Sequence, residues 1–156
     1  MNKWLLAMAI GAMALFPTLG FAENAPGVTA TEIKIGQPLA YSGPAAPYGV
    51  MGKAELAYFK MINDHGGVHG RKITLLSVDD GFNPAKTVEV TRRLVEQDKV
   101  AFIYGALGSM NLAIRAYLNE HKVPQIFPQD VADVYRNPKF PWTVGAPTIT
   151  YFRDGF

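Results

Sequence analysis

Short stretches in which apolar and polar residues alternate are separated by longer stretches with helical spacing. The alternation over residues 32–39 predicts a β-strand, and the Gly- and Pro-rich stretch 41–49 predicts a loop. A helix is predicted from Val50 to the glycine stop at Gly66 and Gly67. Five apolar residues fall on one predicted face of that helix: Met51, Ala54, Tyr58, Met61 and Ile62.

The rest of the chain repeats this succession of strand and helix patterns. A strand is predicted over residues 71–80, and Asn83 followed by Pro84 predicts the N-cap and first residue of a helix. Three shorter apolar runs predict further strands, at residues 100–104, 123–127 and 142–144. A third helix is predicted between the first two of them, with an apolar side of Leu112, Ala113, Ala116 and Tyr117.

The resulting order is β-α-β-α-β-α-β, with a further strand at the end. Strands that alternate with helices predict an α/β fold, in which a parallel sheet is flanked by helices on both faces. Ligands of such sheets bind at the carboxyl ends of the strands. Four loops are expected at that edge: residues 41–49, 79–83, 105–109 and 128–133.

Composition narrows the function classes. The 156 residues predict one domain, and the absence of cysteine excludes disulfides, thiolate catalysis and cysteine-bound zinc. The net charge is only +2 and no Lys/Arg block occurs, so the sequence has no electrostatic footprint for nucleic acid.

Residues 1–22 have the pattern of a secretory signal. Lys3 precedes an apolar run over residues 4–16, which Pro17 ends, and small residues occupy positions 20 and 22. The alternative is a membrane anchor, but the apolar run is too short to span about 30 Å of hydrocarbon. The pattern predicts export with cleavage after Ala22.

The turn at residues 105–109 is the most informative candidate site. Its glycines allow the main chain to come close to a ligand, and the start of the following helix favours an anion. Ser109 and the neighbouring amides are therefore candidates for binding a carboxylate. The alternative is that Ser109 only caps the helix. The residues around it match neither a phosphate-binding loop nor a dinucleotide fingerprint nor a nucleophile elbow, which argues against enzymatic use of Ser109.

Other candidates have plainer interpretations. His65 and His69 have a helical metal-ligand spacing, but the two glycines between them argue against a continuous helix. Asp79 and Asp80 are a candidate catalytic or metal-binding pair, although such a pair more often accepts hydrogen bonds from turn amides. The loop tyrosines, Tyr41 and Tyr48, could stack on a ligand or pack within the loop. We expect neither a metal nor a cofactor.

Several motifs resemble the leucine/isoleucine/valine-binding family of type I periplasmic binding proteins. They are Ser-Gly-Pro with a later Tyr-Gly at residues 42–49, Asn-x-x-Gly-Gly-x-x-Gly-Arg at residues 63–71, and Val-Asp-Asp with Asn-Pro-Ala-Lys at residues 78–86. The resemblance implies a non-enzymatic periplasmic protein that binds a small solute and delivers it to an ABC permease. The same fold also serves as the ligand domain of receptors and regulators, so a sensor is the alternative.

The resemblance also implies roles for individual residues. Ser109 matches a carboxylate-binding serine, with Ala106 and Gly108 in the same turn, Tyr48 matches a tyrosine of the cleft, and Gln129 matches a position whose carbonyl faces a ligand ammonium.

Two features depart from the family pattern. Val131 stands where amino-acid binders place a hydroxyl residue, which argues against an α-amino acid as the ligand. Relatives also have a second lobe of similar size. We therefore expect residues 23–156 to form the N-terminal lobe of a protein truncated before that lobe.

Overall fold

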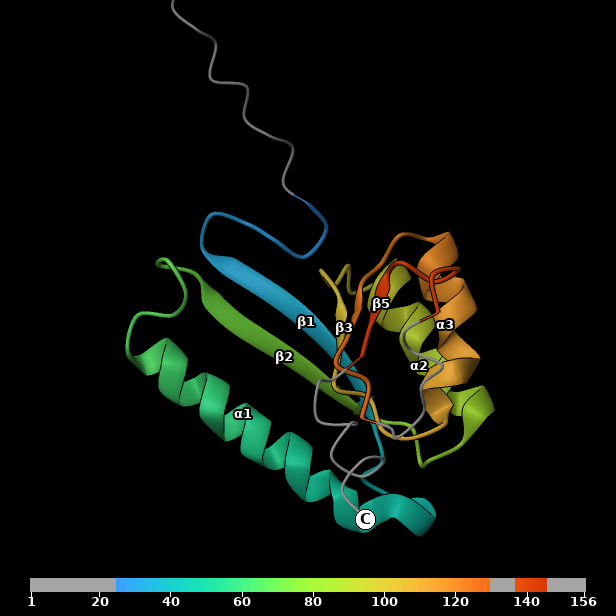
Figure 1. Ribbon diagram of the computed structural model, residues 1–156. Helices are drawn as coiled ribbons and strands as arrows, with labels where there is room; N and C mark the ends of the chain where they lie inside the picture. Colours follow the sequence, from blue (N-terminus) through green and yellow to red (C-terminus); the bar gives the residue numbers. More distant parts are fainter. Residues whose placement is uncertain (1–24, 130–136, 146–156) are drawn as a thin grey trace, which may run out of the picture.

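The computed structural model describes residues 25–129 and 137–145 of the chain. Five strands form one sheet in the order β2-β1-β3-β4-β5, and every neighbouring pair is parallel (Figure 1). This confirms the predicted fold class. The strands are β1 (Glu32–Leu39), β2 (Lys72–Asp79), β3 (Ile103–Tyr104), β4 (Gln125–Ile126) and β5 (Thr143–Val144).

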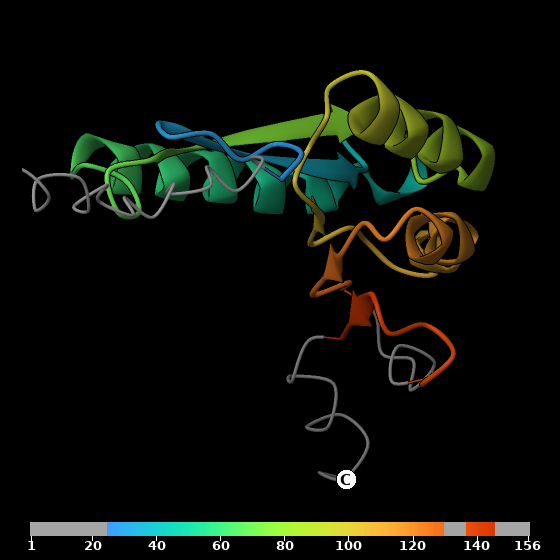
Figure 2. The ribbon, with the colours of Figure 1, turned by 90° about the horizontal axis from the view of Figure 1, so that it is seen from above.

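Helices lie on both faces of the sheet. Helix α1 (Gly49–Asp64) lies along one face of β1 and β2, whereas α2 (Pro84–Glu96) lies on the opposite face (Figure 2). Helix α3 (Met110–Glu120) packs beside α2. A short 3-10 helix, η1 (Gly43–Tyr48), occupies most of the stretch that the sequence predicted as a loop. Among the described residues, no helix is long and apolar enough to cross a membrane.

The main core lies between α2, α3 and the central strands. Seven buried side chains form it: Val90, Leu94, Val100, Ile103, Ala106, Ile114 and Leu118. The start of α2 is fixed as predicted, because the Asn83 side chain accepts hydrogen bonds from the amides of Ala85 and Lys86, at 2.9 and 3.2 Å. The core therefore fixes how α2 and α3 pack against the strands, whose carboxyl ends form the edge where a ligand is expected.

The predicted face of α3 is mostly wrong, although Tyr117 is partly buried and packs against the core. Leu112 is 39% exposed, and the buried residues are Asn111, Ile114 and Leu118. Asn111 is responsible for this difference, because its side-chain amide donates to the carbonyl oxygens of Ala106 and Gly108, each at 2.8 Å. A hydrogen-bonded polar residue thus takes an inward position that the apolar pattern assigned to its neighbours.

The predicted face of α1 is also only partly correct. Tyr58 and Met61 are 55% and 47% exposed, and the helix is buried at Gly52 instead. A β-carbon at Gly52 would collide with the hydroxyl of Tyr41 and would lie 2.6 Å from a methyl carbon of Leu39. The absence of a side chain at Gly52 therefore brings α1 close to the end of β1.

Candidate ligand-binding site

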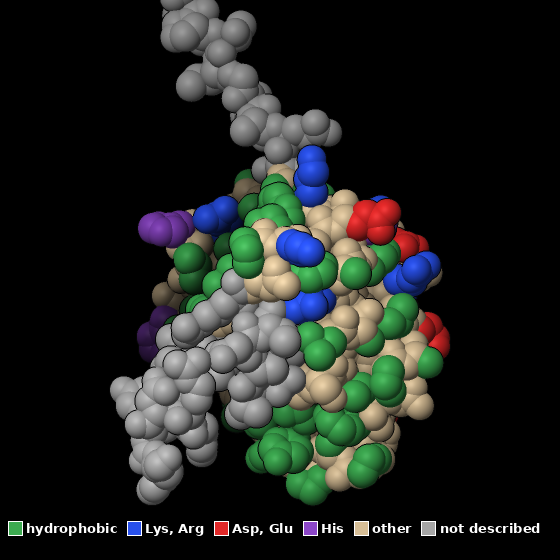
Figure 3. All heavy atoms as spheres, turned by 45° about the vertical axis from the view of Figure 1, so that its right-hand side comes forward, with side chains coloured by type: hydrophobic (Ala, Val, Ile, Leu, Met, Phe, Trp, Pro, Cys, Tyr) green, Lys and Arg blue, Asp and Glu red, His purple; other side chains and the backbone are tan. Residues whose placement is uncertain are grey.

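A pocket of about 710 Å³ lies at the carboxyl ends of the strands. All four loops expected at this edge contribute residues to its lining. Figure 3 shows hydrophobic side chains gathering at this end of the molecule. The lining residues are Pro44, Ala45, Tyr48, Met51, Phe82, Leu107, Gly108 and Gln129.

The turn after β3 is tied to the segment after β4. The amide of Gly108 donates to the carbonyl oxygen of Gln129 at 2.7 Å, and the amide of Gln129 donates to the carbonyl oxygen of Ala106 at 2.8 Å. Gly105 and Gly108 both have a positive φ, 55° and 61°, a conformation that glycine adopts without steric cost. These bonds and turns make one continuous pocket wall from two loops.

Ser109 is exposed at the start of α3, beside the pocket. Its backbone is helical, with φ −61° and ψ −13°, and its side chain makes no capping hydrogen bond, so the capping interpretation is wrong. Within the described part of the chain, neither its amide nor its hydroxyl has a hydrogen-bond partner. Both groups lie at the positive end of the α3 dipole, where an anion is favoured.

The other expected site residues take different positions. Tyr48, 54% exposed, lines the pocket together with Gly108 and Gln129. Ala106 is only 1% exposed and packs in the core, so it acts in the turn through its main chain. Val131 lies outside the described residues.

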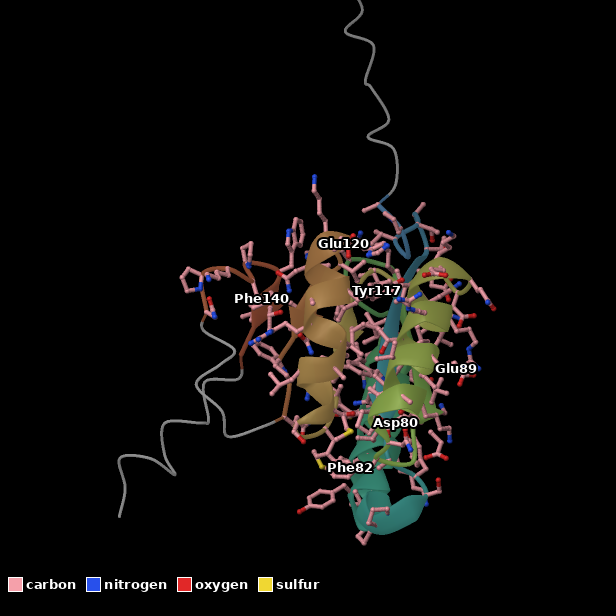
Figure 4. The ribbon with its side chains drawn as sticks, turned by 90° about the vertical axis from the view of Figure 1, so that its right-hand side faces the viewer. Asp80, Phe82, Glu89, Tyr117, Glu120 and Phe140 are labelled. Carbon is pink, nitrogen blue, oxygen red and sulfur yellow. The ribbon has the colours of Figure 1, made fainter. Side chains whose placement is uncertain are left out.

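Phe82 is a pocket residue that the sequence did not indicate. It follows β2 by three residues and lines the pocket from the β2–α2 connection (Figure 4). Its φ of 56° is unusual for a residue other than glycine. The available signal is its position between Gly81 and the Asn83 cap, which indicates a turn but gives no direction for the ring.

Asp79 and Asp80 hold turns, as the second interpretation of this pair predicted. Asp79 Oδ1 accepts hydrogen bonds from the amides of Tyr41, Ser42 and Gly81, at 2.9–3.0 Å. The Ser42 hydroxyl bond, together with Lys86 and these amides, holds the pKa of Asp79 well below its usual range, although partial desolvation opposes the shift. Asp79 therefore ties the loop after β1 to the loop after β2.

A chain of polar side chains lies beneath α1. Tyr41 shares a 2.6 Å hydrogen bond with the Ser77 hydroxyl, which donates to Gln37 Oε1 at 2.7 Å. Gln37 in turn donates to Glu55 Oε2 at 2.6 Å, and burial raises the pKa of Glu55 against the effect of this bond. Tyr41 thus packs inside the fold, whereas Tyr48 faces the pocket.

The two histidines of the sequence pattern lie at the end of α1. The helix ends at Asp64, and the ring nitrogen Nδ1 of His65 is 2.7 Å from the carbonyl oxygen of Met61. His69 lies beyond the helix with φ 50°. No group of three or more metal-ligating side chains gathers among residues 25–129 and 137–145.

Comparison with known proteins shows what the chain is similar to. The family model described as periplasmic binding protein matches residues 32–151. An amino acid binding protein from Pseudomonas aeruginosa is 32% identical over 108 residues, which cover 67% of this chain and 27% of that protein.

Solved structures agree with this match. A possible leucine/isoleucine/valine-binding protein from Rhodopirellula baltica has a TM-score of 0.68 and 27% identity, covering 78% of this chain and 33% of that one. A fatty acid ABC transporter substrate-binding protein from Thermomonospora curvata has a TM-score of 0.60 and 32% identity, and the match covers 70% of this chain and 28% of that one. The matched region thus spans about a third or less of each relative's length. The chain belongs to the periplasmic binding protein family, and within it to the type I proteins that resemble the leucine/isoleucine/valine-binding proteins.

Proposed function

We propose that the chain forms one lobe of an exported solute-binding protein that delivers a small carboxylate solute to an ABC permease. The observation that carries the proposal is the pocket at the strand ends, where an apolar lining meets the free Ser109 groups at the start of α3. Pockets for small molecules combine apolar walls with a few polar groups that orient the ligand. A solute with a carboxylate at one end and an apolar body fits this combination.

The carboxylate end is assigned to the turn at Gly108 and Ser109. The Ser109 amide and hydroxyl are donors, and the helix start adds a favourable potential for a negative charge. Among the described lining residues, none carries an acidic side chain that would repel the carboxylate.

The proposed ligands include carboxylic acids other than amino acids. One relative is described as binding amino acids and another as binding fatty acids, and both classes carry a carboxylate on an apolar body. Val131, at the position where amino-acid binders have a hydroxyl residue, favours a carboxylic acid without an α-ammonium group. A second lobe would close over the ligand by hinge motion, so we expect the chain by itself to bind only weakly.

Binding is tested by titrating the purified chain with a panel of carboxylates: isoleucine, benzoate, decanoate and their matching amides. We expect weak binding of acids and none of the amides. The Ser109→Ala variant should bind the same acid about tenfold to a hundredfold more weakly, because a hydrogen bond to a charged group is lost. The control is Thr31→Ala, which removes an exposed hydroxyl at the amino end of β1. Equal affinity in all three proteins would contradict the proposal.

Export is tested separately, by intact-mass measurement of the periplasmic protein. The signal pattern predicts a mature chain that begins at Glu23. Recovery of a chain that still carries Met1, from the membrane fraction, would contradict export by cleavage.

A further inference from the structure

We propose that Phe82 determines ligand specificity, by selecting carboxylates with a planar aromatic body over saturated ones of the same size. This inference rests on the proposed function and names the ligand class of the same pocket. It is carried by the placement of the Phe82 ring against Gly108, by the buried carboxylate that holds the main chain of its turn, and by the presence of Tyr48 in the same pocket lining.

The Phe82 ring lies against the turn that is assigned to the carboxylate. A β-carbon added at Gly108 would be 3.1 Å from Cε2 and 3.3 Å from Cζ of the ring. Gly108 immediately precedes Ser109, so the ring lies against the residue before the Ser109 donors. An aromatic body attached to a bound carboxylate would therefore meet the Phe82 ring.

The main chain of the turn that carries Phe82 is held by Asp80. Asp80 is only 2% exposed, and its Oδ1 accepts a hydrogen bond from the amide of Phe82 at 2.9 Å. Its Oδ2 accepts a hydrogen bond from the hydroxyl of Thr87 at 2.8 Å, which joins the turn to α2. The same two bonds stabilise the turn in which Phe82 has a φ of 56°.

A second aromatic ring faces the pocket from another loop. Tyr48 lines the same pocket at the end of η1, and in the described part of the chain it makes no ring contact with Phe82. Two aromatic side chains from different loops thus line one pocket. A planar aromatic ligand can make offset or edge-to-face contacts with them, which a saturated ring of equal carbon number lacks.

The competing explanation is that Phe82 is only an apolar filler. An apolar filler would favour both kinds of ring equally, because burial of apolar area does not depend on aromaticity. Benzoate and cyclohexanecarboxylate distinguish the two explanations, since they share the carboxylate and the number of carbons but differ in planarity and aromaticity.

The experiment is an NMR titration of the full chain, its Phe82→Leu variant and its Phe59→Leu variant with both acids. Phe59 is a half-buried phenylalanine of α1 that contacts Tyr104 outside the pocket, so Phe59→Leu controls for the general effect of losing a ring. The original chain and Phe59→Leu should prefer benzoate. Phe82→Leu should lose about two- to tenfold of this preference, as expected for one aromatic pair. A nuclear Overhauser effect between benzoate and the Phe82 ring in the original chain provides a test that needs no variant.

The outcomes separate the two proposals. An unchanged preference in Phe82→Leu, or benzoate binding without an Overhauser effect to Phe82, overturns the role of Phe82 but leaves the proposed function intact. If the chain binds other carboxylates but neither benzoate nor cyclohexanecarboxylate, the role of Phe82 is again overturned and the proposed function stays intact. Failure of the original chain to bind any carboxylate overturns the proposed function, and the inference with it.

Discussion

The amide of Gly108 donates a 2.7 Å hydrogen bond to the carbonyl oxygen of Gln129, which joins the turn after β3 to the segment after β4. Gly108 has a φ of 61°, and the same residue lies against the Phe82 ring. Backbone conformation, loop pairing and the shape of the pocket therefore depend on one glycine.

Replacement of Gly108 by alanine is expected to destabilise the fold and to weaken ligand binding. The positive φ alone should cost about 1 kcal/mol, and the added β-carbon must also displace the Phe82 ring. Gly70→Ala is a matched control, because Gly70 has a φ of 77° but nothing within 4 Å of an added β-carbon. Urea unfolding should show a larger loss of stability for Gly108→Ala than for Gly70→Ala. Equal losses would show that the contact with Phe82 does not contribute to the free energy of unfolding.

Glu55→Gln is expected to stabilise the chain at neutral pH. Burial raises the pKa of Glu55 in the folded state, so the stability linked to its proton is present below the unfolded pKa of about 4.3 and is lost as the pH rises through the folded value. The amide removes this loss and can still accept the hydrogen bond from Gln37. Thermal unfolding should favour the variant at pH 7 and show no difference near pH 4. Glu89→Gln, at an exposed position of α2, is the control, and an equal effect there would contradict the prediction.

Asp79 should have the opposite pH dependence. Its pKa is depressed in the folded state, so its contribution is present above the unfolded pKa of about 3.9 and is lost as the pH falls below that value. The Asp79→Asn variant should be less stable than the original chain at pH 7 and should lose less stability on acidification. Asp64→Asn is the control, since Asp64 is an exposed partner of Lys60 at 2.7 Å. Parallel acid losses in the original chain and in Asp79→Asn would contradict the role of Asp79.

The fold was predictable because its strands and helices follow clear patterns. The alternation at residues 32–39, the glycine stop after α1 and the Asn83 cap all lie where the sequence placed them. The parallel arrangement then places the connecting loops at one edge, and the pocket is lined by residues from all of the loops expected there.

The errors have a common physical cause, which is that some inward positions are not apolar. Asn111 is buried because main-chain carbonyls satisfy its amide, and Gly52 is buried because α1 approaches β1 closely. The spacing of apolar residues indicates neither the burial of Asn111 nor that of Gly52. Phe82 was missed for a related reason, because its turn is held by the hydrogen bonds of Asp80 rather than by any pattern of residue types.

Amide chemical-shift mapping of the full chain during titration with benzoate tests whether this pocket binds a carboxylate. We predict that the largest shifts occur at Tyr48, Phe82, Gly108, Ser109 and Gln129, and that residues at the opposite end of the sheet, such as His69 and Gly70, do not respond. Absent shifts would overturn the role proposed for Phe82. Shifts that gather away from the carboxyl ends of the strands would contradict the claim that this pocket binds a carboxylate.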